Sequence, residues 1–521
     1  MSEVLKCFPF KTFRKHQQET IEKVQKHFES EKEYVILESP TGSGKSGIAV
    51  CLSLFNGNSF LLTSQKVLQD QYWNDFSNKG LHLLKGKSNY SCVNFGNCDC
   101  AEGCLRITKK CPMRDMCIYE LEKKKAMNSK ILLTNYSYYL HVMEYARFLQ
   151  PRALTIFDES HNLEQHVFSI VEFSFSSYWL SKLGVVSKIP EYQTVQEYVY
   201  WVQELLSKIE TLKIQTESQI NFIKDSSSID LVLLANLKKE MEALESQSNK
   251  INKFLKTYES TEWIFDLTDS KVGNKITFKP LTIASFTKDL LFSMSEKKLL
   301  MSATIGGKKN LCKTLGINED ECEYISVPSS FSNDRRPIFL TKSGNMSHSK
   351  IESTLPKVAE DINTILEHHS NEKGLIHSQS YKIQNYIKEN VAEVFKNRII
   401  THDSTDRTSS LAEFIKSNKP KVLVTPSMTD GIDLKDDLAR FIVIVKIPYL
   451  FLGDKQIKRR MEIDPEWYRW KAALTLVQAA GRAMRHDNDH CTIYIMDSGI
   501  KWFIKQNRDY FPEYFIDSIQ N

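Results

Sequence analysis

The residues ESPTGSGKS at positions 38–46 decide the fold of this chain. An apolar run at 34–37 precedes them and a helix-like run at 47–52 follows, which is the context that a phosphate-binding loop requires. Backbone N–H groups of such a turn point at the phosphates. Lys45 would reach the β- and γ-phosphates, and Ser46 would hold Mg²⁺. The alternative is a glycine-rich turn with an incidental lysine.

The loop departs from the usual G-x-x-x-x-G-K-S pattern at its first position, where Ser39 replaces glycine. Serine is small enough to fit there, so we keep the assignment. We expect a nucleoside triphosphate to bind along the whole loop. Its members are Pro40, Thr41, Gly42, Ser43, Gly44, Lys45 and Ser46.

The second motif is acidic and follows the apolar run 153–157, a run that is typical of a buried strand. Asp158 and Glu159 stand at the end of that run. Asp158 would hold Mg²⁺, directly or through water, and Glu159 would orient and polarise the attacking water. An acidic turn at the end of a strand is the plainer interpretation, but the phosphate loop upstream favours catalysis.

Basic and polar residues at two further places complete the expected nucleotide site. The helical run 476–485 places Gln478, Arg482 and Arg485 on adjoining faces, from which two arginines could reach a γ-phosphate across a cleft. The alternative there is a surface helix whose basic residues face DNA. Arg14 and Gln17 precede the loop and could contact the base or a phosphate, although a capped surface helix would also explain them.

Length and composition limit the number of domains and the class of protein only broadly. A chain of 521 residues is too long for one core and predicts three or four domains. Its 41% hydrophobic and 26% charged residues are ordinary for a soluble globular protein, and a net charge of +5 permits nucleic-acid binding without requiring it. We find no 18-residue apolar run and no signal-peptide core, so we expect a cytoplasmic protein and no membrane partner. Compact length and a Lys/Asn/Ile-rich composition suggest a bacterial cell or a phage-infected one.

Cysteine is concentrated in one short region. Six of the 11 cysteines fall between positions 92 and 117, namely Cys92, Cys98, Cys100, Cys104, Cys111 and Cys117. In a reducing compartment such a cluster indicates a metal site rather than a disulfide framework. Four thiolates suit both an iron–sulfur cluster and zinc, and spacing alone does not choose between them.

The segment 166–280 differs in character, because glycine and proline become scarce while Glu, Lys, Gln and Ser rise. Apolar residues recur there at helical spacing, and we predict a helical hairpin that is broken near 225–228. Its apolar stripes are most simply core. The strand–helix pattern returns at 297–305, and the chain crosses into a second α/β half near 329–337.

With these motifs in view, the chain resembles the XPD/DinG family of superfamily 2 helicases. Seven motifs carry the resemblance in the family's order: Arg14–Gln17, the loop at 40–46, the run 63–71, the Asp-Glu-x-His box at 158–161, Ser-Ala-Thr at 302–304, Asp-Gly-Ile-Asp at 430–433, and the arginine helix at 478–485. Ser160 stands where alanine is common, and Asp430 stands where many members have Glu. Both departures are mild.

The resemblance implies an α/β fold. Two RecA-like P-loop motor domains are expected, with a small Cys-rich metal domain and a helical arch domain both inserted in the first. We place the first motor domain at 1–87, 123–165 and 281–327, the iron–sulfur domain at 88–122, the arch at 166–280 and the second motor domain at 328–521. Asp433 would join the ATP site, with Arg14 and Gln17.

The resemblance also implies a [4Fe–4S] cluster, with Zn²⁺ as the rival. Cys92 and Cys117 look like the family's first and last ligands, and Cys111 lies six positions before Cys117. The remaining ligand is Cys104, Cys100 or Cys98, and we choose Cys104 by its spacing to Cys111. Polar strand ends would track a DNA strand. The residues we assign to DNA are Thr63, Gln65, Gln69, Asn135, Tyr136, Ser378 and Tyr381.

The expected activity is that of an ATP-dependent DNA helicase that moves 5′→3′, a direction that only the resemblance implies. We expect a monomer that acts on single-stranded DNA and on forked or tailed duplexes, with accessory proteins, in repair, replication or recombination. Two other classes stay open. One is a nucleic-acid-stimulated ATPase that remodels protein–nucleic-acid or RNA complexes without unwinding, and the other is a non-enzymatic adaptor stabilised by a metal.

Overall fold

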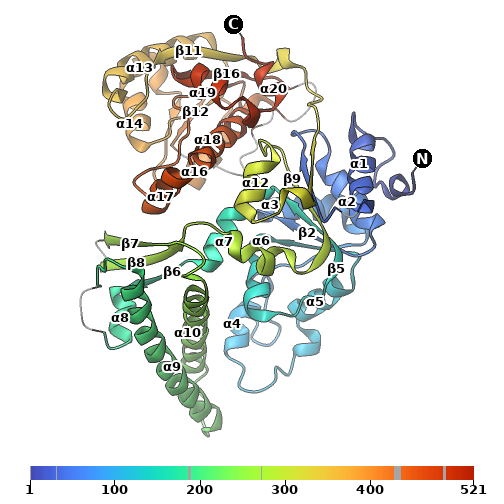
Figure 1. Ribbon diagram of the computed structural model, residues 1–521, viewed down its shortest axis with the longest axis vertical. Coiled ribbons are helices and arrows are strands. Elements are labelled where there is room, and N and C mark those ends of the chain that lie inside the picture. The colour runs from blue at the N-terminus through green and yellow to red at the C-terminus, as the bar shows by residue number, and fades with distance from the viewer. Residues whose placement is uncertain are drawn as a thin grey trace.

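Two parallel sheets organise the protein (Figure 1). The computed structural model describes residues 2–30, 32–185, 189–270, 273–426, 434, 436–484 and 489–520. Sheet 1 has seven strands, which in spatial order are β10 (Cys322–Ser326), β1 (Tyr34–Glu38), β9 (Ser295–Ser302), β5 (Arg152–Asp158), β2 (Ser59–Thr63), β4 (Ile131–Asn135) and β3 (Leu81–Leu83). Because all of their pairings are parallel, the carboxyl ends of these strands meet at one edge.

Sheet 1 is apolar on both faces, as helices on both sides require. Val35 and Leu37 of β1 join one hydrophobic cluster, and Ile36 between them joins the other. The first cluster is covered by α1 (Gln17–Glu29), α2 (Lys45–Phe55) and α3 (Lys66–Phe76); the second is covered by α6 (Tyr136–His141), α7 (Leu163–Val171) and α12 (Lys308–Leu315). Sheet 1 and these helices are called the first lobe.

Sheet 2 is also parallel and forms the second lobe with its helices. Its strands in spatial order are β11 (Ile338–Gly344), β16 (Thr492–Asp497), β15 (Phe441–Ile444), β12 (Gly374–His377), β14 (Val422–Thr425) and β13 (Ile399–Ile400). Its helices are α13 (Ile351–His368), α14 (Tyr381–Asn390), α15 (Glu393–Lys396), α16 (Arg407–Lys416), α17 (Lys455–Ile463), α18 (Pro465–Ala480), α19 (Ile500–Gln506) and α20 (Glu513–Ile516). The predicted α/β class with two parallel sheets is therefore confirmed.

The segment between α7 and β9 contains the predicted helical hairpin and also an antiparallel sheet that we did not predict. The hairpin consists of α9 (Val195–Asp225) and α10 (Leu231–Thr257), preceded by α8 (Ser177–Lys182). The sheet has the order β6 (Phe173–Ser176), β8 (Gly273–Pro280) and β7 (Trp263–Ser270), and α11 (Ala284–Thr287) follows it. Ile276 and Phe278 are buried in alternation along β8, the period-2 pattern of a half-buried strand. This segment is called the insertion.

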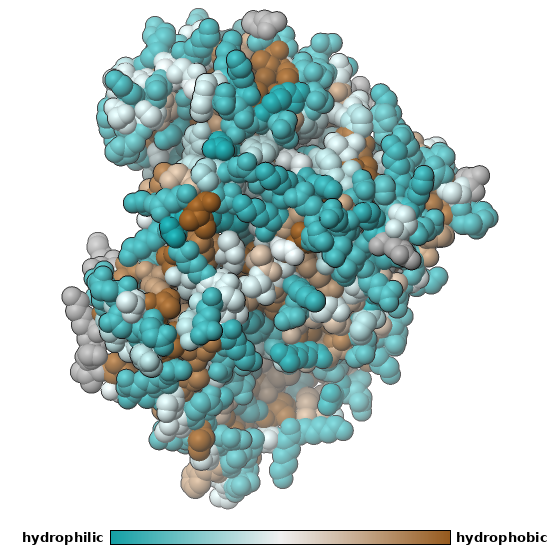
Figure 2. All heavy atoms as spheres, viewed as in Figure 1, coloured by the Kyte–Doolittle hydropathy of each residue, from teal (hydrophilic) through white to brown (hydrophobic). Residues whose placement is uncertain are grey.

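The cysteine region extends from the first lobe between β3 and β4 (Figure 1). It contains α4 (Cys100–Leu105) and α5 (Ile118–Asn128). Hydrophilic residues cover most of the face in Figure 2, and hydrophobic residues are scattered among them. Within the described ranges, no helix combines the length and the apolar character needed to cross a membrane.

Candidate active site

The phosphate loop follows β1, and its shape depends on two glycines with left-handed backbone. Gly42 has φ of +83° and Gly44 has φ of +82°, a region that side-chain-bearing residues rarely adopt. Space is limiting as well, because a Cβ atom at Gly44 would lie 2.4 Å from Gln17 Nε2. Ser39 donates from Oγ to Ser43 Oγ at 2.7 Å, so the serine that replaces the usual glycine is part of the loop's own hydrogen bonding.

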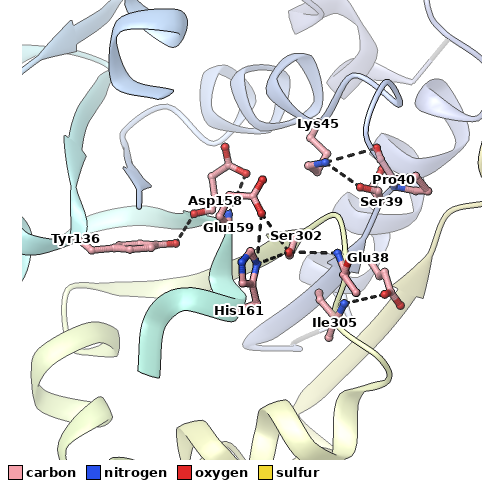
Figure 3. A network of polar contacts seen from close by, with 11 residues as sticks. Glu38, Ser39, Pro40, Lys45, Tyr136, Asp158, Glu159, His161, Ser302 and Ile305 are labelled. Carbon is pink, nitrogen blue, oxygen red and sulfur yellow. Dashed lines mark hydrogen bonds and ion pairs between the residues drawn. The ribbon is translucent and has the colours of Figure 1, made fainter. Parts of the chain in front are cut away.

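Charged and polar side chains are already gathered on this loop. Lys45 donates from Nζ to Ser39 O at 2.9 Å, as Figure 3 shows. Arg14 donates to Gly42 O at 2.5 Å, and Gln17 donates to Gly44 O at 2.9 Å. The Arg14–Gln17 element therefore braces the loop through its carbonyl groups, and its predicted contact with the nucleotide remains a prediction.

Asp158 ends β5 and lies buried among hydrogen-bond donors. Tyr72 donates to its Oδ2 at 3.0 Å, and the Glu159 N–H donates to its Oδ1 at 3.1 Å. Burial and the neighbouring Glu159 charge raise the pKa of Asp158 to about 7, although Lys45 and the Tyr72 hydroxyl act in the opposite direction. A divalent cation at this carboxylate would favour its ionised form.

Glu159 is held by a small network with His161 and Ser302 (Figure 3). Ser302 donates from Oγ to Glu159 Oε2 at 3.3 Å, and His161 Nδ1 lies 2.7 Å from Ser302 Oγ and 3.3 Å from Glu159 Oε2. Burial raises the pKa of Glu159, but its partners, chiefly His161 and Lys45, more than offset burial and lower the pKa below its usual range. The carboxylate is therefore ionised and able to accept a proton or to orient water.

Glu38, at the end of β1, ties the phosphate loop to the segment that follows Ser-Ala-Thr. Its Oε1 accepts hydrogen bonds from Ile305 N at 2.7 Å and from Gly306 N at 3.2 Å, and its other oxygen accepts one from Tyr324. Ser39 N also donates to Ser302 O at 2.9 Å. The loop and the Ser-Ala-Thr segment are thus held as one unit.

The second lobe brings the arginine helix to this site. Thr41 Oγ1 lies 3.4 Å from Met484 O, two residues beyond Arg482, and the positive charge of Arg482 contributes to the low pKa of Glu159. Burial, and secondarily Arg482, lowers the pKa of His377 to about 3, so this histidine at the end of β12 is neutral. Gln478 is on α18. Arg485 and Asp433 lie outside the described residues.

The residues predicted to contact DNA divide by burial. Thr63, Gln69, Tyr136 and Ser378 are buried, whereas Gln65 and Asn135 are half-buried and Tyr381 is exposed. Tyr136 donates its hydroxyl to Asp158 O at 2.5 Å, so its ring packs inside the first lobe. The assignment of Tyr136 to DNA stays a prediction, as do those of the other residues.

Five cysteines line one cavity in the cysteine region. They are Cys92, Cys100, Cys104, Cys111 and Cys117, and Cys98 is not among them. Cys100 Sγ lies 3.8 Å from Cys117 Sγ, and a Cβ atom at Gly103 would come 2.4 Å from Cys92 Sγ. In the described part of the chain, no three of the Cys, His, Asp or Glu side chains are placed to share a single ion. All four predicted ligands nevertheless face a common space, so the donor set fits a cluster bound by thiolates.

Comparisons with known proteins agree with this geometry. Residues 362–517 match the helicase C-terminal domain family, and residues 10–199 match the family described as type III restriction enzyme, res subunit. The chain is 22% identical to the ATP-dependent DNA helicase YoaA of Haemophilus influenzae over 94% of its length and 91% of that protein. It is 25% identical to the ATP-dependent DNA helicase DinG of Photobacterium profundum, over 46% of its length and 37% of that protein.

A solved XPD helicase matches the fold with a TM-score of 0.67 and 16% identity, covering 96% of this chain and 98% of that one. The chain resembles the XPD/DinG-like superfamily 2 helicases. The shared fold places the cysteine region and the insertion between strands of sheet 1, since connections between parallel strands can hold whole domains without disturbing the sheet.

Sequence reasoning missed three residues of this site. Tyr72, Glu38 and His161 hold the nucleotide-site carboxylates and the phosphate loop, yet we assigned them no individual role. His161 lies within the Asp-Glu-x-His box, and that position was the available signal. Nothing in the local pattern distinguishes Tyr72 from other apolar positions of α3.

Proposed function

We propose that this protein is an ATP-dependent DNA helicase, in which ATP and Mg²⁺ bind between the two lobes. The observation that supports it most is the meeting of the phosphate loop, the Asp158–Glu159 pair and the arginine helix at the carboxyl edge of sheet 1. The relatives YoaA and DinG are named ATP-dependent DNA helicases. Moderate positive charge permits the same substrate here.

The residues divide the reaction among them in this proposal. Lys45 would give up its hydrogen bond to Ser39 O and bind the β- and γ-phosphates. Ser46 and Asp158 would hold Mg²⁺. Glu159, ionised and oriented by His161 and Ser302, positions the attacking water. Arg482 and Arg485 neutralise charge that develops on the γ-phosphate, assisted by Gln478. Since the arginines belong to the second lobe, hydrolysis depends on closure of the cleft.

The proposed domain division is the one expected from sequence, with a crossing between the motor domains at about residue 328. Its support is that β10 pairs within sheet 1 whereas β11 pairs within sheet 2, and the two strands end and begin at Ser326 and Ile338. The insertion serves as the arch. We also propose that translocation runs 5′→3′, on the strength of the family resemblance alone.

We propose that Cys92, Cys104, Cys111 and Cys117 hold a [4Fe–4S] cluster, with Cys100 as the fifth thiol of the cavity. Such a cluster would order a region with little apolar core. The test is iron content and absorbance near 400 nm after anaerobic purification. Wild type and Cys98→Ser should both retain iron, and Cys111→Ser should lose it. Stoichiometric zinc in a colourless protein would contradict the proposal.

The proposed ATPase activity is tested by phosphate release with and without single-stranded DNA. Wild type should hydrolyse ATP faster when DNA is added, and Lys45→Ala should abolish hydrolysis while binding of fluorescent single-stranded DNA persists. Full hydrolysis by Lys45→Ala would overturn the assignment of the loop. Hydrolysis without strand separation on any tailed duplex would favour the remodelling ATPase instead.

A further inference from the structure

Helix α17 stands between the second lobe and the stem of the insertion. In Figure 1 it lies at the lower end of the second lobe, directly above β7 and β8. It begins after Asp454, whose Oδ1 accepts hydrogen bonds from Gln456 N at 2.8 Å and Ile457 N at 3.2 Å. It is followed directly by α18, which carries Gln478.

α17 contacts both strands at the base of the β7–β8 hairpin, where the chain leaves the insertion. Gln456 donates from Nε2 to Pro280 O at 2.5 Å, and Lys279 Nζ lies 2.9 Å from Asp454 Oδ2. Arg459 donates to both carboxylate oxygens of Glu262, from Nε at 2.7 Å and from Nη2 at 3.4 Å. Pro280 closes β8 and Glu262 immediately precedes β7, so these contacts fix the base of the hairpin.

The same helix also contacts the chain that enters the insertion. Arg460 forms a buried ion pair with Glu164 on α7, which begins just after the Asp-Glu-x-His box and leads into β6. Lys471 of α18 lies 2.8 Å from the other oxygen of Glu164. The Arg460 guanidinium also stacks on Trp467 at 3.9 Å from the ring centre. Entry and exit of the insertion therefore meet on one short helix.

The first half of α18 is fastened to the first lobe as well. Trp470 donates from Nε1 to Ile305 O at 2.7 Å, two residues beyond Ala303 of the Ser-Ala-Thr motif. Trp467, Trp470 and Leu474 belong to the hydrophobic cluster on one face of sheet 1. A rotation of the second lobe would therefore turn about this fixed point, with α17 projecting from it.

We propose that α17 is the link through which the second lobe moves the insertion. This inference rests on the proposed function, since closure of the cleft driven by ATP supplies the movement of the second lobe. Each exposed ion pair contributes little stability alone, but several directional contacts on two strands fix the orientation of the hairpin relative to the helix. Closure of the cleft would thus displace the insertion together with α17, and a strand held by the insertion would be pulled rather than released.

Weakening the contacts at the hairpin base tests the link. Asp454→Asn combined with Arg459→Glu keeps an N-cap oxygen on α17, removes both ion pairs to the hairpin base and places the introduced carboxylate beside that of Glu262. We expect DNA-stimulated ATP hydrolysis within about twofold of wild type and at least a threefold loss of base pairs opened per ATP. Adding Glu262→Arg should restore most of that ratio. Lys309→Glu is the matched control. Lys309 on α12 of the first lobe pairs at 2.9 Å with Glu466 on α18 of the second lobe, so the pair joins the two lobes and involves no residue of the insertion. The control should leave the ratio unchanged.

Hydrogen exchange supplies a readout that does not depend on unwinding. In wild type, a non-hydrolysable ATP analogue with Mg²⁺ should change exchange in α17 and at the base of β7 and β8 together; in the doubly substituted variant it should change α17 alone. An unchanged unwinding ratio, failure of Glu262→Arg to restore it, or an unaltered hairpin response in the variant would each overturn the link. If wild type fails to separate strands, the proposed function fails, while hydrogen exchange still decides the link.

Discussion

Glu164→Gln removes the carboxylate that pairs with two buried or nearly buried cations, Arg460 and Lys471. Glu164 and Arg460 side chains are 5% and 4% exposed, and Lys471 is 16% exposed. Burial raises the pKa of Glu164, but Lys471 and Arg460 together outweigh it and lower the pKa to about 2 from 4.5. At about 1.4 kcal/mol for each pH unit, that change corresponds to about 3 kcal/mol. Breaking a buried ion pair costs about 3–5 kcal/mol, so the two arguments agree.

The assay is urea unfolding at pH 7, followed by tryptophan fluorescence because Trp467 and Trp470 lie within the contact. We expect Glu164→Gln to lower the free energy of unfolding by about 3 kcal/mol. Since the folded pKa is depressed, the stabilisation is complete above pH 4.5 and is lost as pH falls toward 2. The difference between wild type and variant should therefore shrink below about pH 4.5.

The matched control is Glu466→Gln on α18, the helix that also carries Lys471; it removes the exposed partner of Lys309. Its urea midpoint should equal that of wild type, because exposed ion pairs contribute little. If Glu164→Gln unfolds at the same midpoint as this control, the buried ion cluster does not fasten the second lobe to α7, and the reasoning fails.

Two further predictions concern the nucleotide site. Tyr72→Phe removes the hydroxyl that donates to Asp158 Oδ2. Loss of about 1 kcal/mol should raise the Mg²⁺ concentration for half-maximal binding of a fluorescent ATP analogue about fivefold. Substitution of the exposed Tyr200 by Phe should leave that concentration unchanged, and equal Mg²⁺ dependence for the two variants would contradict the assignment. Gly44→Ala forces a Cβ to within 2.4 Å of Gln17 Nε2 and should abolish binding of that analogue, whereas Gly57→Ala, with φ of +90° but open space, should retain it. Binding by Gly44→Ala equal to that by Gly57→Ala would contradict the prediction, because crowding at Gly44 would then not limit nucleotide binding.

The local motifs were predictable because their chemistry is encoded within a few residues. The loop at 38–46, the acidic strand end at 158–159 and the apolar strands all lie where sequence reasoning placed them. Parallel strands bring their carboxyl ends together, so assigning strands correctly also placed the motifs near one another.

Features that depend on distant contacts were not predictable. Tyr72 meets Asp158 across 86 positions, and Arg460 meets Glu164 across 296. Without the fold, each is an ordinary residue on an amphipathic helix. Strand β8 was missed because lysine and threonine alternate with its few apolar residues, and β7 was missed because its apolar run is short, within a segment whose composition is helical. Cys98, Cys100 and Cys104 lie too close in sequence for spacing to choose among them; in the structure Cys100 and Cys104 line the cavity, and Cys98 is not among its lining residues.

Strand displacement on tailed duplexes tests the central claim most directly. With ATP and Mg²⁺, wild type should separate a duplex with a 5′ single-stranded tail, leave a 3′-tailed duplex intact, and do neither without ATP. Glu159→Gln should bind ATP and DNA but separate nothing, because the water-orienting carboxylate is gone. Separation by Glu159→Gln at the wild-type rate, or ATP hydrolysis by wild type with neither duplex opened, would contradict the proposal that this protein is a DNA helicase driven by the Asp158–Glu159 site.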